Sequence, residues 1–438
     1  MVLFGLTSRI IPYSPALRSP TGRRRVVRSA ARPPATLTHR LPIDRAIKIF
    51  MDFIPHGIIP FGIIRTKRRK RMNPFKYGCV VAGENYCRRP ELQRQLTELV
   101  KSGQNVVVQG PRRMGKTSLV VETVRSIRGI TLLYVDLFSV RSVGEFCRKV
   151  VSATAKCGKR SFLERTAELV KGLRPVFSVD RDTGAPTISV DVKSARSVES
   201  VDEVMDMIAS HSSTKRLCVV FDEFQDMLDL PDSDAVLAAL RSKIQFLPDT
   251  PFIFLGSVRN RMRDIFDSPR SPFFKSAISF GVEHIDETTM TEFLIGRFKS
   301  GNRRIDRKTI GEIMRMADFI PGDIQELCET TWLATADGQT VSAGDVVNGL
   351  EAVFARESRA FISTFSRLTT VQANVLKGLA EPNHSKVFSG EFMKTYGIRN
   401  VGSISKALKR LVADEIIYEF DGEYLFENPF FRDWVRRR

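Results

Sequence analysis

The fold of this chain is decided by one stretch, Gly110-Pro111-Arg112-Arg113-Met114-Gly115-Lys116-Thr117. It fits the pattern G-x-x-x-x-G-K-[ST] and follows the short β-branched run Asn105–Val108, while apolar residues after it recur at helical spacing. A glycine-rich turn from strand to helix lets backbone N–H groups close around phosphate oxygens at the positive end of a helix dipole. The stretch therefore predicts a phosphate-binding loop, and an ordinary strand-turn-helix is the alternative.

The residues of this loop are expected to differ in role. Lys116 is predicted to reach the β- and γ-phosphates, and Thr117 to place its hydroxyl on Mg²⁺. The side chains of Arg112, Arg113 and Met114 are expected to point to solvent rather than to the ligand. The predicted nucleotide-binding set is Gly110, Pro111, Arg112, Arg113, Met114, Gly115, Lys116, Thr117 and Ser118.

A second apolar run, Leu217–Phe221, ends in the adjacent carboxylates Asp222 and Glu223. Asp222 is predicted to hold Mg²⁺, and Glu223 to polarise a water for attack on the γ-phosphate, with Gln225 helping to orient that water. Taken alone, Asp-Glu after a strand is more often a helix N-cap. The phosphate loop upstream favours the magnesium interpretation.

A third run, Phe252–Leu255, ends in Gly256 and Ser257, and Thr131–Asp136 is a further predicted strand. Ligands of open parallel sheets bind beyond the carboxyl ends of the strands, so Ser257 is placed to sense the γ-phosphate. A plain strand-ending serine is the alternative for Ser257. The predicted catalytic set is Lys116, Asp222, Glu223 and Ser257.

The C-terminal part of the chain has the pattern of a winged helix. Helices are predicted to begin at Leu368 and to cover Ser389–Tyr396, and a third contains the inward-facing Ile404, Leu408 and Leu411. Two short strands flanking Asp421-Gly422 complete the pattern. The outer face of the third helix carries Ser403, Lys406, Lys409 and Arg410, but the wing carries Glu419, Asp421 and Glu423. DNA contact and protein docking therefore both stay open.

These segments together resemble the archaeal-type ATPase family, P-loop ATPases of the AAA+ and STAND kind. The resemblance covers about residues 73 to 438 and includes Asn73–Gly78, Val81–Glu84, the phosphate loop, Phe221–Gln225 and Ser268–Ser276. It implies an adenine-binding clasp at the entry residues and acidic, sensor and post-sensor segments further on.

The chain departs from the family pattern at two points. The lid segment Pro321–Gln325 has Gln325 where related initiator ATPases have a nucleotide-sensing arginine, and a neutral amide stabilises developing phosphate charge less well. For an arginine finger acting across an interface, Arg270 and Lys275 are the candidates, with solvated side chains as the alternative.

The predicted fold class is α/β: a parallel-sheet P-loop NTPase core with a helical lid and a C-terminal winged-helix domain. We expect a basic leader over 1–72, the ATPase core over 73–288, the lid over 289–357 and the winged helix over 358–438. Roughly residues 158 to 200 are predicted to be an insertion with an amphipathic helix and a hairpin.

Charge is concentrated in the leader, which holds 16 Lys and Arg against two Asp, a net +14 of the formal +19. The leader is interpreted as a disordered nucleic-acid-binding arm, a targeting peptide or sequence upstream of a start at Met72; the last is favoured because Met72 abuts the first family motif. Within it, Ala46–Ile64 is too interrupted by charge and proline to predict a membrane span. The six cysteines show no C-x-x-C spacing, so no zinc site and a cytoplasmic chain with reduced thiols are expected.

The sequence therefore predicts an ATPase that uses ATP and Mg²⁺ and acts as a nucleotide-dependent switch. The expected partners are ATP and ADP, DNA through the winged helix, and a protein partner or further copies of the chain, with no membrane. The alternative is a nucleotide-bound regulator or scaffold with negligible turnover, whose winged helix binds proteins.

Overall fold

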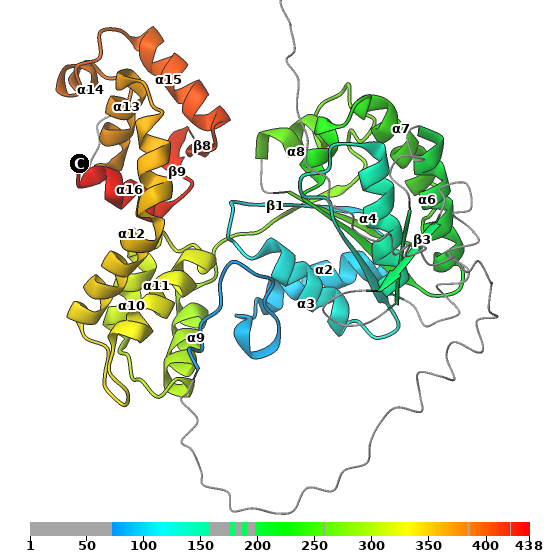
Figure 1. The fold of residues 1–438 in the computed structure, drawn as a ribbon, viewed down its shortest axis with the longest axis horizontal. Helices are drawn as coiled ribbons and strands as arrows, with labels where there is room; N and C mark the ends of the chain where they lie inside the picture. The colour runs from blue at the N-terminus through cyan, green and yellow to red at the C-terminus, as the bar shows by residue number, and fades with distance from the viewer. Residues whose placement is uncertain are drawn as a thin grey trace, which may run out of the picture. The chain divides into compact units, whose positions relative to one another are not determined.

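The computed structural model describes residues 72–157, 175–179, 186–190, 198–256, 259–382, 386–420 and 422–438. A five-stranded parallel sheet, in the order β2-β5-β6-β1-β7, forms the centre of the first part (Figure 1). Its strands are β1 (Val106–Gln109), β2 (Thr131–Asp136), β5 (Leu217–Asp222), β6 (Phe252–Leu255) and β7 (Ile278–Gly281). The strands predicted at 131, 217 and 252 are confirmed, and β1 begins one residue later than expected.

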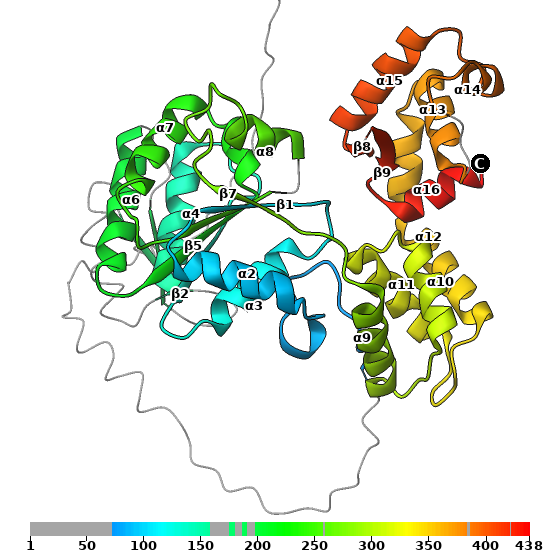
Figure 2. The same cartoon turned by 180° about the vertical axis from the view of Figure 1, so that it is seen from behind.

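Helices cover both faces of this sheet, as the two opposite views show (Figures 1 and 2). Along β5, Val219 and Phe221 pack into the cluster on one face, while Cys218 and Val220 pack into the cluster on the other. This period-two alternation leaves every residue of β5 buried, which explains why the strand is a continuous apolar run. One face is covered by α2 (Pro90–Lys101) and α3 (Lys116–Ser126), the other by α4 (Val143–Lys156), α6 (Val198–Ser212) and α7 (Ser233–Ile244).

The predicted hairpin of the insertion is confirmed. β3 (Pro175–Val179) and β4 (Pro186–Val190) pair antiparallel. The helix predicted before this hairpin lies outside the described residues, as do residues 1–71 and Ser257. The remaining short elements of the core are η1 (Gly83–Asn85), η3 (Phe224–Asp229) and α8 (Arg259–Phe266).

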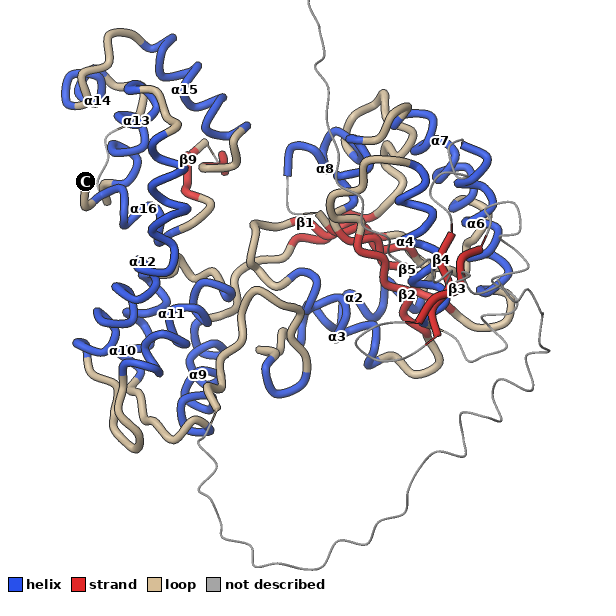
Figure 3. The backbone as a smooth tube through the Cα atoms, viewed as in Figure 1, coloured by secondary structure: helices blue, strands red, loops and turns tan. Residues whose placement is uncertain are grey.

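The segment after the sheet is helical, as the lid prediction requires (Figure 3). A capping box formed by Ser342 and Asp345 starts its last helix, which continues without a break past residue 358 into the winged-helix part. The lid helices are α9 (Glu287–Ser300), α10 (Arg307–Met316), α11 (Pro321–Ala334) and α12 (Ala343–Ser366).

The winged-helix pattern is confirmed. Strands β8 (Ile417–Phe420) and β9 (Glu423–Phe426) pair antiparallel, with Phe420 opposite Glu423. Within α15, Ile404 is buried and Lys409 is exposed, as the helical spacing predicts. The helices of this part are α13 (Thr370–Ala380), α14 (Gly390–Thr395), α15 (Val401–Ala413) and α16 (Pro429–Arg436).

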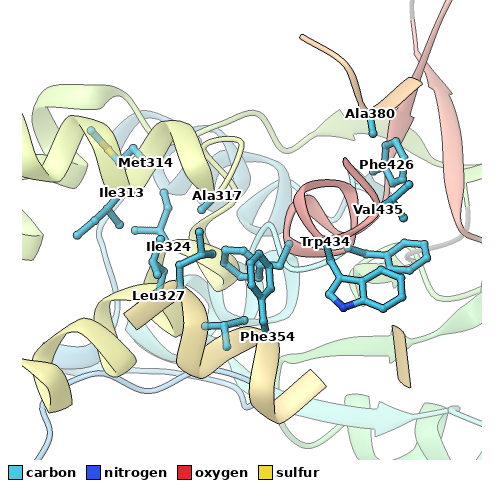
Figure 4. Packing of buried hydrophobic residues seen from close by; sticks show 14 of the residues in the cluster. Ile313, Met314, Ala317, Ile324, Leu327, Phe354, Ala380, Phe426, Trp434 and Val435 are labelled. Atoms are coloured by element: carbon cyan, nitrogen blue, oxygen red, sulfur yellow. The ribbon is translucent and has the colours of Figure 1, made fainter. Parts of the chain in front are cut away.

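One continuous apolar cluster joins the lid helices to the winged helix (Figure 4). Ile324 of the lid and Val435 of α16 belong to the same cluster, and Phe361 of α12 lies 5.8 Å, ring centre to ring centre, from Trp434. Because a shared core resists relative motion more than a flexible linker does, the lid is mechanically joined to the C-terminal module.

None of the helices within the described ranges combines the length and the apolarity needed to cross a bilayer. The apolar stretch Ala46–Ile64 lies outside those ranges.

The contact between α11 and α12 depends on a glycine, which gives a direct test of the lid packing. A Cβ at Gly349 would lie 2.6 Å from Thr331 Oγ1 and 2.8 Å from the Thr331 backbone nitrogen. We expect Gly349→Ala to lower the free energy of unfolding by about 1–3 kcal/mol, because overpacking outweighs the gain in helix propensity. Thermal unfolding followed by circular dichroism measures the change.

Gly296 provides the matched control, because it also lies inside a lid helix and an added Cβ there meets nothing within 4 Å. Gly296→Ala is expected to raise stability by up to about 1 kcal/mol. If the two alanine variants melted at the same temperature, the described packing of α11 on α12 would be incorrect.

Candidate functional site

The predicted phosphate loop joins β1 to α3, in the context that the motif requires. Gly115 has φ +78°, and a Cβ at Gly110 would lie 3.0 Å from the carbonyl oxygen of Val282. Both glycines are therefore needed, one for its left-handed backbone and one for a close approach. The helix begins at Lys116, so the N–H groups of its first turn face the loop.

Lys116 is buried beneath the loop. Its Nζ donates hydrogen bonds to the carbonyl oxygens of Gly110, at 3.0 Å, and Pro111, at 2.7 Å. A phosphate ligand is a stronger acceptor than a carbonyl for this ammonium group. The side chain is thus placed to exchange carbonyl partners for phosphate oxygens.

Thr117 and Asp222 meet, as their predicted roles demand. The Thr117 hydroxyl donates to Asp222 Oδ2 at 2.8 Å, and the hydroxyl of Tyr134, on β2, donates to the same oxygen at 2.7 Å. Burial raises the pKa of the Asp222 carboxyl, while the hydrogen bonds from Tyr134 and Thr117 oppose the rise. Burial and the nearby Asp222 raise the pKa of the Tyr134 phenol, so Tyr134 stays a donor.

Glu223 follows in a left-handed conformation, with φ +53°. Its backbone N–H donates to Asp222 Oδ1 at 3.0 Å, and its carboxylate accepts a hydrogen bond of 2.6 Å from Nε2 of Gln225. Non-glycine residues seldom adopt this backbone conformation. Here it accompanies different hydrogen-bond partners for the neighbouring carboxylates of Asp222 and Glu223.

These groups line one cavity of about 660 Å³, within the range of small-ligand sites. The predicted adenine-binding entry segment contributes to its wall, and the Val81 N–H donates to Ser118 Oγ at 3.1 Å, which ties that segment to α3. Gln325 of the lid also lines this cavity. The resemblance implies a nucleotide-sensing arginine at this position in related ATPases. Other lining residues include Tyr77, Tyr86, Lys116, Thr117, Asp222, Glu223, Ile285 and Glu415.

The expectation that the loop side chains point to solvent is confirmed for Arg112, which is exposed, and wrong for Arg113 and Met114. Met114 is 1% exposed and packs in the cluster beneath the sheet, because Arg113 has φ +61° and turns the chain inward there. Arg112 forms an ion pair of 2.5 Å with Glu415, just after α15. The three residues are structural contacts of the loop with other parts of the chain.

Arg113 connects the loop to the lid. Its guanidinium forms ion pairs with Asp323 and, at 2.6 Å, with Glu326, and its carbonyl oxygen accepts a 3.0 Å hydrogen bond from the N–H of Gly322. A Cβ at Gly322 would lie 2.9 Å from the Arg113 Cβ. The start of α11 therefore contacts the phosphate loop directly.

Sequence reasoning missed two further side chains at this site. Tyr134 was seen only as part of a strand, although its position near the carboxyl end of β2 was a usable signal. Arg89 is 7% exposed and donates to the carbonyl oxygens of Met114 and Glu283, thereby bracing the loop. No motif identified Arg89.

The candidate finger residues do not join the cavity. Arg270 is exposed, and the Lys275 ammonium lies 5.3 Å from the centre of the Phe274 ring. Ser257 lies outside the described residues, so its role as a sensor stays a prediction.

The donor set at the end of β5 fits a hard divalent cation. A threonine hydroxyl and a carboxylate oxygen 2.8 Å apart, on a group buried to 7% exposure, are oxygen ligands of the kind that Mg²⁺ takes beside phosphate. Asp222 and Thr117 would hold the ion.

The sheet order, the loop and the helices that follow define the fold of a P-loop, Walker-type ATPase core with a helical lid and a C-terminal winged helix. Residues 359–437 match the family model described as a probable winged helix domain. The structure is similar to that of the Walker-type ATPase PABY2304 of Pyrococcus abyssi, at 20% identity and a TM-score of 0.58, covering 81% of this chain and 97% of that one. The resemblance to archaeal-type ATPases is thus confirmed at the level of the fold.

Two more distant structures come from Aeropyrum pernix. One is the ORC1 protein in complex with DNA, at 13% identity and a TM-score of 0.44, covering 80% of this chain and 91% of that one. The other is ORC2 in its ADPNP-ADP complexes, at 15% identity and a TM-score of 0.47, with the same coverage. No curated protein matches the sequence.

The loop-to-lid contact makes a prediction about pH. Burial raises the pKa of the Asp323 carboxyl to about 7, with Arg113 limiting the rise and Glu326 and Asp318 adding to it. Since the folded state binds this proton more tightly than the unfolded state does, the stabilisation is present near pH 4 and is lost as pH rises to about 7. Asp323→Asn removes the titration, so we expect the melting temperature of the parent to rise relative to the variant as pH falls from 8 to 5.

The expected difference corresponds to a few kcal/mol across the window, at about 1.4 kcal/mol per pKa unit. Thermal unfolding of both proteins at several pH values measures it. Parallel curves for the parent and Asp323→Asn would show that Asp323 does not titrate with a raised pKa.

Proposed function

We propose that this chain is a Mg²⁺-dependent ATPase of the AAA+ and STAND kind, which binds and hydrolyses ATP and acts as a nucleotide-dependent switch. One observation carries the proposal: Lys116, Thr117, Asp222 and Glu223 all line a single cavity at the carboxyl ends of β1 and β5. The pair Lys116–Thr117 lies more than 100 positions before the pair Asp222–Glu223, and the parallel sheet brings the two pairs together.

Each residue has a distinct part in the proposed reaction. Lys116 and the N–H groups of the loop bind the β- and γ-phosphates, and Thr117 and Asp222 hold the ion. Bound Mg²⁺ neutralises phosphate charge. Glu223 would accept a proton from the water that attacks the γ-phosphorus; the bond between this phosphorus and the β,γ-bridging oxygen breaks, and ADP and inorganic phosphate are released.

The contacts of the loop support a switch. Arg113 pairs with the lid, and Arg112 pairs with Glu415, just after α15 of the winged-helix module. Triphosphate oxygens entering the loop would attract both guanidinium groups, and so compete with those carboxylates. Nucleotide state would thereby reach the lid and the C-terminal module, which share one apolar core.

Two substitutions separate binding from turnover. Lys116→Ala is expected to weaken ATP binding about 10- to 100-fold, because a charge-assisted hydrogen bond to phosphate contributes about 1.5–3 kcal/mol. Glu223→Gln is expected to keep the affinity for ATP and to lower kcat about 100-fold or more. Calorimetric titration and steady-state phosphate release measure the two quantities; Lys116→Ala binding ATP as tightly as the parent would refute the loop assignment.

A second candidate is a nucleotide-bound regulator with negligible turnover whose winged helix docks on proteins. Gln325 favours it, since this neutral amide lines the cavity where related ATPases have an arginine. The acidic wing, with Glu419 and Glu423, also disfavours a phosphate backbone.

Phosphate release with and without duplex DNA distinguishes the two functions. Stimulation by duplex DNA that declines steeply with salt supports a DNA-linked ATPase. ADP that remains bound through gel filtration, with no release of phosphate above background, supports the regulator.

A further inference from the structure

Gln225 lies between Glu223, which follows β5, and Gly256, which follows β6. It is 3% exposed, its Nε2 donates to the Glu223 carboxylate at 2.6 Å, and the same nitrogen is 3.4 Å from Asp226 Oδ1. Because a carboxylate accepts and cannot donate, this contact sets which end of the amide faces Glu223.

The other end of the amide faces the end of β6. A Cβ built on Gly256 would lie 2.4 Å from Cγ and Sδ of Met262 and 2.7 Å from Gln225 Oε1, so the Met262 side chain and this oxygen together fill the space beside the glycine. Oε1 is buried and accepts no hydrogen bond within the described part of the chain. The hydrogen bond from Nε2 to Glu223 and the burial of the side chain are therefore the contacts that hold Gln225 in place.

The carboxylates of Asp222 and Glu223 thus accept hydrogen bonds from different side chains. Tyr134, from β2, donates to Asp222, and Gln225, from η3, donates to Glu223. Both donors are neutral, so each fixes a carboxylate without cancelling its charge. Glu223 needs that charge to accept a proton from water.

We propose that Gln225 is a positioning residue for Glu223, which fixes the carboxylate for catalysis and transmits to it the position of the β6 end at Gly256. This inference rests on the proposed ATPase function. Gln225 lines the cavity, and its proposed role is exerted through the hydrogen bond to Glu223 rather than by orienting the attacking water directly. A displacement of β6 by the γ-phosphate would move Gln225, and with it Glu223.

Three substitutions test the proposal. Gln225→Leu removes the donor and keeps most of the volume, and Gln225→Glu keeps the shape but replaces the donor by an acceptor. Gly256→Ala pushes on Oε1 and on the Met262 side chain without changing either polar residue. Each variant is expected to bind ATP within about twofold of the parent and to lose about 10- to 100-fold in kcat, as misplacement of a catalytic group does.

The pH profile of Gln225→Glu gives a readout that a structural role would not move. At lower pH the introduced carboxyl becomes protonated and can donate, so the activity of this variant relative to the parent is expected to recover, whereas that of Gln225→Leu is not. Gln225→Leu combined with Gly256→Ala is expected to lose no more than the larger single effect, because both act through one contact.

Gln372 provides the control, since it is also a buried glutamine but belongs to the capping box of α13. Gln372→Leu is expected to lower the melting temperature and to leave kcat unchanged.

The outcomes separate this inference from the proposed function. Turnover of the Gln225 variants at the rate of the parent would overturn the positioning role and leave the ATPase intact. If the Gln225 variants lost both ATP binding and turnover, the positioning role would also be overturned, because Gln225 would then support the fold of the site. A parent that binds ATP and releases no phosphate would refute hydrolysis itself, and with it the positioning role.

Discussion

The hydrogen bond between the Thr117 hydroxyl and the Asp222 carboxylate is the contact on which the site depends. It joins the loop after β1, where we propose phosphate binding, to the end of β5, where we propose acid–base chemistry. These strands are not neighbours, because β6 lies between them, so the bond forms only where all three end at one edge of the sheet. Parallel pairing provides that edge, and burial of the strands on both faces keeps it rigid.

The phosphate loop is also the point where three parts of the chain meet. Arg113 contacts the first turn of α11, while Arg112 contacts Glu415 beside the winged helix. The pair with Glu415 is partly exposed, and such pairs contribute about 1 kcal/mol or less. The contact with the lid is more buried and includes a backbone hydrogen bond from Gly322. In the proposed switch, a ligand in the loop would therefore act more strongly on the lid than directly on the winged helix, and the shared apolar core would transmit the change.

The sequence was sufficient for features that depend on local pattern. Spacing and composition predict the phosphate loop, the apolar strands, the adjacent carboxylates and the inward face of α15. The structure contains all of these features. The side-chain directions of Arg113 and Met114 were predicted wrongly, because they depend on a positive φ at Arg113 that no local pattern requires. The hydrogen bond from Tyr134 to Asp222 could not be predicted for a related reason. It depends on β2 lying next to β5, and strand order is a property of the whole fold.

The central claim is that a nucleotide occupies the cavity beside the phosphate loop, and Cys79 allows a direct measurement. Cys79 lines this cavity and is exposed, whereas among the other described cysteines Cys157 is half-buried and the rest are buried. The rate of alkylation at Cys79, followed by mass spectrometry, reports whether the cavity is filled. The account predicts that ATP with Mg²⁺ slows this reaction saturably, at one nucleotide per chain. An alkylation rate that stays constant up to millimolar ATP, on folded protein, would contradict it.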